Sequence, residues 1–132
     1  MQIIIFKLMD KYYALNTDMV EEIIKKSPST NVPNSPDWVD GLINLRGNVV
    51  TLIDLGFLLN LKESLCYNNI IIYDYQDEKV GLLVEEIIGV REIQTNMIRK
   101  VSKEMEKGIL GIVQMKDYIV NIIDINMLLN SK

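Results

Sequence analysis

Two aspartates, Asp54 and Asp124, occupy the same place in two similar stretches of the chain, residues 41–60 and 111–130. A symmetric pair of carboxylates, one from each half, is the arrangement from which an aspartic-protease dyad is built. That chemistry needs the two carboxyl groups close together, usually through Asp-Thr-Gly turns, whereas here Leu-Gly follows Asp54 and Ile-Asn follows Asp124. Helix capping explains both residues more simply, because each precedes aliphatic residues at helical spacing. A catalytic dyad is the enzyme alternative.

A second constellation is ionic. Glu22 and Arg46 of the first half correspond to Glu86 and Lys116 of the second half. A cross-strand pair of acid and base would follow if their strands are neighbours. The plainest interpretation is a surface ion pair, which adds little stability. Because arginine carries a rigid planar fork of donors, Arg46 could hold Glu22 and still present donors to a partner.

The chain carries an internal duplication. Three pairs of segments recur: 3–6 and 70–73, 20–24 and 84–88, and 41–60 and 111–130. The last pair aligns without a gap and has seven identical positions. We therefore expect one domain over residues 1–132, built from approximate repeats 1–66 and 67–132. A lone core is marginal at the size of one half, so we expect the halves to pack together and share apolar contacts.

Strand signals dominate the elements that must position these residues. β-branched and apolar runs predict strands at 2–9, 12–16, 20–25, 41–46, 48–54, 68–75, 79–84, 109–115 and 118–123. We expect turns at Asp10-Lys11, Gly47-Asn48, 76–78 and Lys116-Asp117, and a proline-containing loop at 26–39. Roughly ten short strands in two matched sets indicate small barrels or a sandwich, with short helices after Asp54 and Asp124.

The composition argues against several functional classes. The chain has no histidine, which removes Ser-His-Asp triads and His-ligated metal sites. A net charge of −4 argues against binding to nucleic acid or to anionic membranes. We find no secretory signal and no apolar stretch near the ~20 residues that span a bilayer, so we expect a cytoplasmic protein. The single cysteine, Cys66, fits a reducing compartment and is expected to be a small filler near the junction of the halves.

The two copies differ at the tip of the later hairpin. Asn44-Leu45-Arg46-Gly47 in the first copy becomes Gln114-Met115-Lys116-Asp117 in the second. Exposed loops on a rigid scaffold are where binding usually occurs, so this difference marks residues 44–47 as a candidate binding segment. The alternative is that Gly47 suits one turn geometry and Asp117 another.

Residues 32–55 resemble the signature of the CheW family. The shared pattern is proline-x-x-proline at 33–36, the aromatic Trp38, Gly41, the Asn-Leu-Arg-Gly run at 44–47 and a β-rich run that ends in Asp54-Leu55. Residues 20–23, 80–84 and 111–129 are similar to further family segments, so the resemblance covers nearly the whole chain. Thr51 stands where the family often has proline, and threonine is a good strand residue.

The resemblance implies an all-β fold of two pseudo-symmetric five-stranded SH3-like β-barrels that share a core, with short helices. It also implies a non-catalytic adaptor without a cofactor, which couples methyl-accepting chemotaxis receptors to the regulatory domain of the histidine kinase CheA. Such a protein is cytoplasmic and reaches membrane receptor arrays through its partners. An interaction module of a non-chemotactic sensory pathway is the alternative. We expect the chain to stand alone rather than as part of a fusion with a receiver domain.

The resemblance also implies contact residues. The candidate receptor-binding residues are Val20, Glu22, Ile24, Gly41, Arg46 and Gly47. The candidate kinase-binding residues, expected on the second barrel, are Lys79 and Val80. Since a docked helix needs apolar anchors and a polar rim, we expect Val20 and Ile24 to be anchors and Arg46 to belong to the rim.

Overall fold

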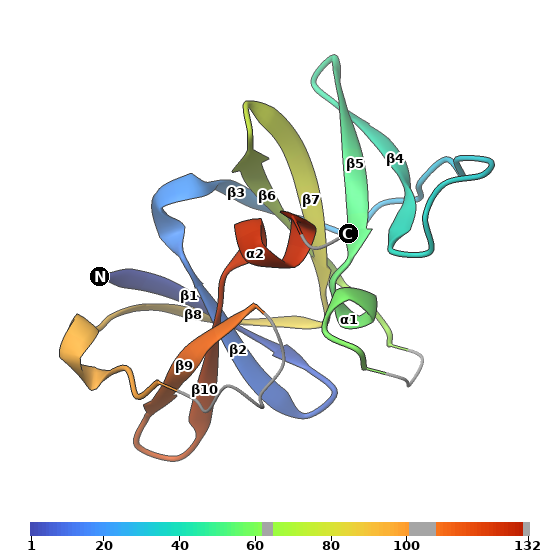
Figure 1. Cartoon of the computed structure of the whole chain (residues 1–132). Helices are drawn as coiled ribbons and strands as arrows, with labels where there is room; N and C mark the ends of the chain where they lie inside the picture. The colour runs from blue at the N-terminus through green and yellow to red at the C-terminus, as the bar shows by residue number, and fades with distance from the viewer. Residues whose placement is uncertain (62–64, 101–107, 131–132) are drawn as a thin grey trace. The chain divides into compact units, whose positions relative to one another are not determined.

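The computed structural model describes residues 1–61, 65–100 and 108–130, and in these ranges it has ten strands and two short α-helices (Figure 1). The elements of the first repeat are β1 (Gln2–Leu8), β2 (Lys11–Asn16), β3 (Val20–Lys25), β4 (Val39–Leu45), β5 (Asn48–Asp54) and α1 (Leu55–Leu58). Those of the second are β6 (Asn69–Tyr75), β7 (Glu78–Val84), β8 (Glu86–Glu92), β9 (Ile109–Gln114), β10 (Ile119–Ile123) and α2 (Ile125–Asn130). Two 3-10 turns, Thr17–Met19 and Thr95–Met97, lie between strands.

Three of the hairpin turns have positive φ at both central residues, as in type I′ turns. These turns are Met9–Asp10 (φ 51° and 61°), Arg46–Gly47 (51° and 86°) and Gln76–Asp77 (50° and 64°). The turns expected at Asp10-Lys11 and Gly47-Asn48 were therefore placed one residue too late. Lys11 and Asn48 already pair with Leu8 and Leu45 as the first residues of β2 and β5.

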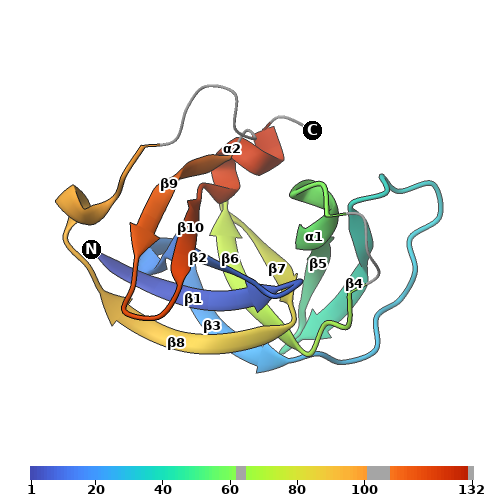
Figure 2. The ribbon, with the colours of Figure 1, turned by 90° about the horizontal axis from the view of Figure 1, so that it is seen from below.

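The chain divides into two compact units, each with one five-stranded sheet. The first unit comprises Met1–Asp18 and Ile87–Lys132, and its strand order is β8-β1-β2-β10-β9. In Figure 2, β1, β2 and β10 lie side by side, with β1 antiparallel and β10 parallel to β2. The core cluster of this unit consists of Ile3, Ile5, Ala14, Ile93, Val113, Val120 and Ile122.

The second unit comprises Met19–Glu86, with strand order β3-β6-β7-β5-β4. Its parallel pair is β5 with β7, and α1 packs on β7. The core cluster of this unit consists of Ile43, Val50, Leu52, Ile70, Ile72 and Leu83. The burial of these β-branched and leucine side chains is the main source of stability for a sheet of this size.

Each repeat places its opening hairpin in the sheet of the other repeat. The hairpin β1–β2 pairs with strands of the second repeat, and β6–β7 pairs with strands of the first. The two sheets then have the same order of equivalent strands, so the duplication is visible as a pseudo-symmetric topology. The compact units consequently do not coincide with the sequence repeats 1–66 and 67–132. The expected all-β fold with two five-stranded sheets is confirmed, while a core shared by the two units stays a prediction.

In each sheet, one isolated β-bridge joins the segment that follows one edge strand to the strand at the opposite edge. Thr30, which follows β3, exchanges hydrogen bonds with Leu42 of β4 at 2.8 and 2.9 Å. Arg99, which follows β8, does the same with Ile112 of β9 at 2.8 and 2.9 Å. These bridges join the ends of each sheet, which is how a small barrel removes its open edges.

The expected role of Cys66 is wrong. The Cys66 side chain is exposed, so it does not fill an apolar gap. It lies in the connection between α1 and β6, where neighbouring residues alternate between exposed and half-buried positions.

Candidate interaction site

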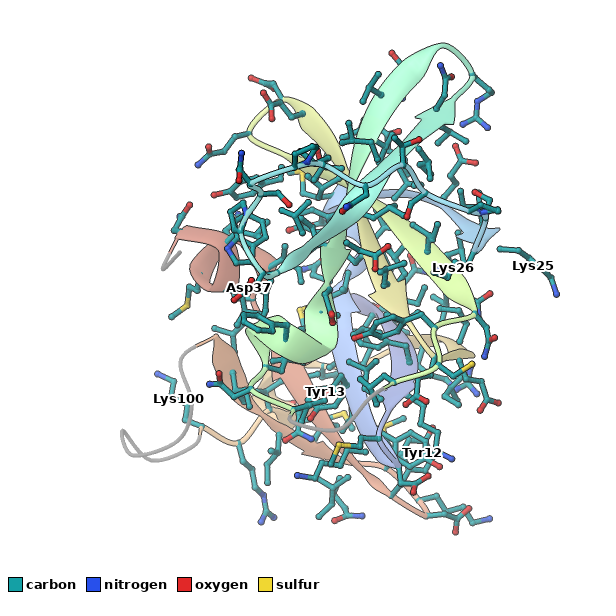
Figure 3. The ribbon with its side chains drawn as sticks, turned by 90° about the vertical axis from the view of Figure 1, so that its right-hand side faces the viewer. Tyr12, Tyr13, Lys25, Lys26, Asp37 and Lys100 are labelled. Carbon is teal, nitrogen blue, oxygen red and sulfur yellow. The ribbon has the colours of Figure 1, made fainter. Side chains whose placement is uncertain are left out.

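The side chains of edge strand β3 alternate between two environments. The half-buried set is Val20, Glu22 and Ile24, and the exposed set is Glu21, Ile23 and Lys25. Ile24 packs against the core cluster of the second unit, whereas Ile23 is 39% exposed. Figure 3 shows Lys25 directed away from the ribbon. Ile23 is thus an exposed apolar side chain on β3, and sequence reasoning missed it because alternation defines two faces without saying which one faces the core.

Arg46 and Glu22 form the ion pair that the sequence predicted. Nη1 of Arg46 donates to Oε1 of Glu22 at 3.3 Å, and Nη2 donates to Oε2. The hydrogen bond with Glu22, and then the charge of Glu22, raise the pKa of the Arg46 guanidinium. The pair connects edge strand β3 to the turn that follows β4, the strand at the opposite edge of the sheet. Because the Arg46 side chain is 62% exposed, its remaining donors are accessible to a partner.

The second copy lacks this pair. Glu86 and Lys116, which both lie within the described residues, are not joined by a salt bridge. The difference between the copies therefore extends from the sequence of the hairpin tip to its electrostatics.

Lys79 pairs with the acid next to Glu22. Nζ of Lys79 lies 3.2 Å from Oε2 of Glu21. The β3–β6 register shifts between Val20 and Glu22, and such a bulge changes the direction of successive side chains. Strand β3 therefore carries two consecutive carboxylates, each paired with a base from a different part of the same unit. Sequence reasoning did not find the Glu21–Lys79 pair, because no local pattern connects β3 to β7.

Lys79 and Val80 were expected on a different barrel from the candidate receptor contacts, and this expectation is wrong. Both residues lie on β7, in the same unit as Val20 and Arg46, because the opening hairpins are exchanged between the repeats. Val80 is buried between Tyr73 of β6 and Thr51 of β5. Lys79 is the one of the two candidate kinase contacts with a partly exposed side chain.

The two candidate glycines have different surroundings. Gly41 is buried, and a Cβ on it would lie 2.7 Å from the carbonyl oxygen of Thr30. Gly41 therefore permits the close approach that the Thr30–Leu42 bridge requires, and it presents no surface of its own. Gly47 is exposed at the hairpin tip, and a Cβ there would have no heavy atom within 4 Å.

Comparison with known proteins identifies the family. The family model of the CheW-like domain matches residues 2–132. The chain belongs to the CheW family. It is 34% identical to the chemotaxis protein CheW of Bacillus subtilis over 99% of this chain and 88% of that protein. It is 29% identical to the CheW of Thermotoga maritima over 97% of this chain and 87% of that protein.

A solved CheW structure has the same fold. The crystal structure of the scaffolding protein TtCheW from Thermoanaerobacter tengcongensis matches with a TM-score of 0.85 and 28% sequence identity. The match covers 96% of this chain and 90% of TtCheW. The two-sheet architecture is therefore that of a CheW protein.

In this CheW-family chain, both duplicated aspartates cap helices, as the sequence predicted. Oδ1 of Asp54 accepts a hydrogen bond from the Phe57 N–H at 3.1 Å, at the start of α1. Oδ1 of Asp124 accepts one from the Met127 N–H at 3.2 Å, in α2. Capping uses the carboxylates to satisfy helix donors that would otherwise lack partners.

Tyr67 extends the first cap, and sequence reasoning missed this role. Its hydroxyl donates to Oδ1 of Asp54 and accepts from the Gly56 N–H at 3.1 Å. Burial of the half-buried ring, and then the hydrogen bond to Asp54, raise the pKa of the Tyr67 hydroxyl well above its ordinary value of 10.0. Asp54 and Tyr67 thus each accept a hydrogen bond from a backbone N–H at the N-terminus of α1.

We expect Tyr67→Phe to destabilise the protein by about 1–3 kcal/mol near neutral pH, because the Gly56 N–H and Asp54 each lose a half-buried hydrogen-bond partner. The folded-state pKa of Tyr67 is raised, so this stabilisation is complete below pH 10.0 and is lost as the pH rises further. Urea unfolding of both proteins between neutral pH and about pH 11 measures the difference, which should shrink above pH 10.0.

Tyr118→Phe is the control for that experiment. Its ring stacks on Tyr12 with centroids 4.2 Å apart, and phenylalanine keeps this contact. We expect a change within about 0.5 kcal/mol. A Tyr67→Phe protein as stable as the wild type at neutral pH would show that the hydroxyl bonds contribute nothing.

The described residues contain no helix long and apolar enough to cross a membrane. In the same ranges, no three His, Cys, Asp or Glu side chains gather closely enough to hold a metal ion.

Proposed function

We propose that this chain is a non-catalytic adaptor that couples methyl-accepting chemotaxis receptors to the histidine kinase CheA. The observation that carries this proposal is the match to CheW over residues 2–132, combined with an exposed arginine at the hairpin tip where the two copies differ. The protein would be cytoplasmic and would reach receptor arrays at the membrane through these partners, without a direct contact to lipid or nucleic acid.

The proposed receptor-binding face consists of β3 and the turn between β4 and β5. Val20 and the exposed Ile23 supply apolar contacts, and Arg46 supplies donors at the rim. Receptor tips are helical hairpins in this family, and an amphipathic helix binds through spaced apolar anchors and a polar rim. Glu22 holds the guanidinium, Gly47 forms the turn, and Gly41 and Ile24 support the face from within the unit.

The proposed kinase contact includes Lys79, with Val80 packed behind it. Lys79 is held by Glu21 on β3, and Glu21 is adjacent in sequence to the acid that holds Arg46. Scaffolding is sufficient as a mechanism, because an adaptor that fixes kinase and receptor side by side lets a conformational bias in one change the equilibrium of the other.

Reconstitution tests the proposal. CheA and a membrane-inserted chemotaxis receptor from the same genome are mixed with and without the purified chain, and the kinase that sediments with receptor membranes is measured. We expect sedimentation of CheA to depend on the chain, and ATP-dependent autophosphorylation of CheA to become sensitive to receptor ligand only when all three are present. Equal recruitment of CheA without the chain, or no binding of the chain to either partner, would contradict the proposal.

A further inference from the structure

Arg46 adopts a backbone conformation that its own side chain does not favour. Its φ is 51°, in the left-handed region, and Gly47 follows with φ 86°. Residues with a Cβ disfavour this region, so a neighbouring group that holds the turn at Arg46 stabilises it.

The Asn44 side chain supplies that support. Its Oδ1 accepts a hydrogen bond from the Gly47 N–H at 2.9 Å, across the turn that contains Arg46. Asn44 is exposed near the end of β4, and this bond spans the two residues, Leu45 and Arg46, that separate it from Gly47. A side-chain acceptor at this place closes the turn on itself, as asparagine does in other tight turns.

The second copy provides a comparison within the same chain. Gln114 replaces Asn44, and its Nε2 donates to the carbonyl oxygens of Met115 at 2.8 Å and Tyr118 at 3.4 Å. Lys116 and Asp117 are not among the described residues with positive φ. The copy without the asparagine thus has a different turn, and its base at the tip does not reach the equivalent glutamate.

We propose that Asn44 is a positioning residue for receptor binding, and that it acts through Arg46. This inference rests on the proposed function. Asn44 holds the turn with Arg46 in the left-handed region and so places the guanidinium over β3. There Glu22 accepts hydrogen bonds from one edge of the guanidinium. The remaining donors then meet the receptor without a further ordering step, and pre-ordering of a contact residue increases affinity.

Titration of the full chain against the signalling-tip fragment of a chemotaxis receptor from the same genome tests this. We expect Asn44→Ala and Asn44→Gln to weaken binding by about 3- to 10-fold, the range for loss of one organising hydrogen bond. Asn44→Asp keeps an oxygen acceptor at the same place and should retain most of the affinity. Gln114→Ala, at the equivalent position of the other copy, is the matched control and should bind like the wild type.

Two readouts separate positioning from general destabilisation. Asn44→Ala should weaken the intraresidue amide–Hα NOE of Arg46, because this NOE is strong only for positive φ. The unfolding midpoint should stay near that of the wild type. In an Arg46→Ala background, Asn44→Ala should cause no further loss of affinity, because the two substitutions remove one interaction.

The outcomes are distinct. If Arg46→Ala leaves receptor binding unchanged, the proposed receptor face is wrong and this inference falls with it. If Arg46→Ala weakens binding but Asn44→Ala does not, or if the two losses add in full, only the positioning role of Asn44 is wrong.

Discussion

Arg46→Glu should abolish receptor-dependent recruitment of CheA while the protein remains folded. We expect the affinity for the receptor tip to fall by about 30-fold or more, as for an interfacial arginine on which binding depends. The substitution places a carboxylate opposite Glu22 and removes the guanidinium donors from the tip of the β4–β5 hairpin. Since the Arg46 side chain is 62% exposed, the unfolding midpoint should change little. Sedimentation of CheA with receptor membranes and calorimetric titration measure the two effects.

Lys116→Glu is the matched control for Arg46→Glu. It makes the same charge reversal at the equivalent hairpin tip of the other unit, where no salt bridge to Glu86 exists among the described residues. We expect this variant to recruit CheA normally. Equal losses for both variants would mean that net charge rather than the position of Arg46 determines binding.

A charge-swapped variant separates the two roles of Arg46. Glu22→Arg combined with Arg46→Glu can re-form an ion pair between β3 and the hairpin tip with reversed polarity. If Arg46 only closed the sheet, the double variant would recover binding. We expect binding to stay lost, because the donors then lie on β3 and a carboxylate occupies the tip.

The strands, the helix caps and the Arg46–Glu22 pair were predictable because each leaves a local or a repeated signal. β-branched runs indicated the strands, and the matched Asp54 and Asp124 before leucine pairs indicated the caps. The acid–base correspondence of Glu22 with Glu86 and of Arg46 with Lys116 indicated the ion pair, although not that it would form in one copy alone.

The exchange of the opening hairpins was not predictable from this sequence. The two opening hairpins begin alike, at 3–6 and 70–73, so each carries the same local pattern whichever repeat it pairs with. Only the tertiary pairing distinguishes the alternatives. For the same reason the sequence did not predict that Lys79 lies in the same unit as the candidate receptor contacts, or that Glu21 forms an ion pair with it.

The turn at Arg46 illustrates a different limit. Glycine and asparagine are the residues that favour positive φ, so the sequence pointed to Gly47-Asn48. In the fold, Asn48 opens β5 and the left-handed conformation falls on Arg46. The strand register, and not the local preference of glycine and asparagine for positive φ, therefore decides where the turn lies. The exception falls on Arg46, which we propose to be functional, and such exceptions are expected at functional sites.

Gly41→Ala should lower the stability of the protein and weaken receptor binding as well. Its Cβ would lie 2.7 Å from the carbonyl oxygen of Thr30, a backbone atom that can move only if the Thr30–Leu42 bridge opens. We expect a destabilisation of about 1–3 kcal/mol, as for overpacking of a close contact. Opening the bridge also shifts β4 away from β3, so the Arg46 guanidinium would no longer sit over Glu22. Urea unfolding and receptor-tip titration measure the two effects.

Gly111→Ala and Gly47→Asn complete this test. Gly111 makes the equivalent approach in the other unit, with a Cβ 2.5 Å from the carbonyl oxygen of Arg99, so its substitution should cost similar stability. It should leave receptor binding nearly unchanged under conditions where the protein is folded.

A Cβ added at Gly47 would have free space around it, and asparagine tolerates the φ of 86° at this position. Gly47→Asn should therefore keep stability near that of the wild type. If Gly41→Ala were as stable as the wild type, the close approach at the bridge would not be the reason that both copies carry glycine there. If Gly111→Ala lost binding as strongly as Gly41→Ala, the receptor face would not be confined to β3 and the β4–β5 turn.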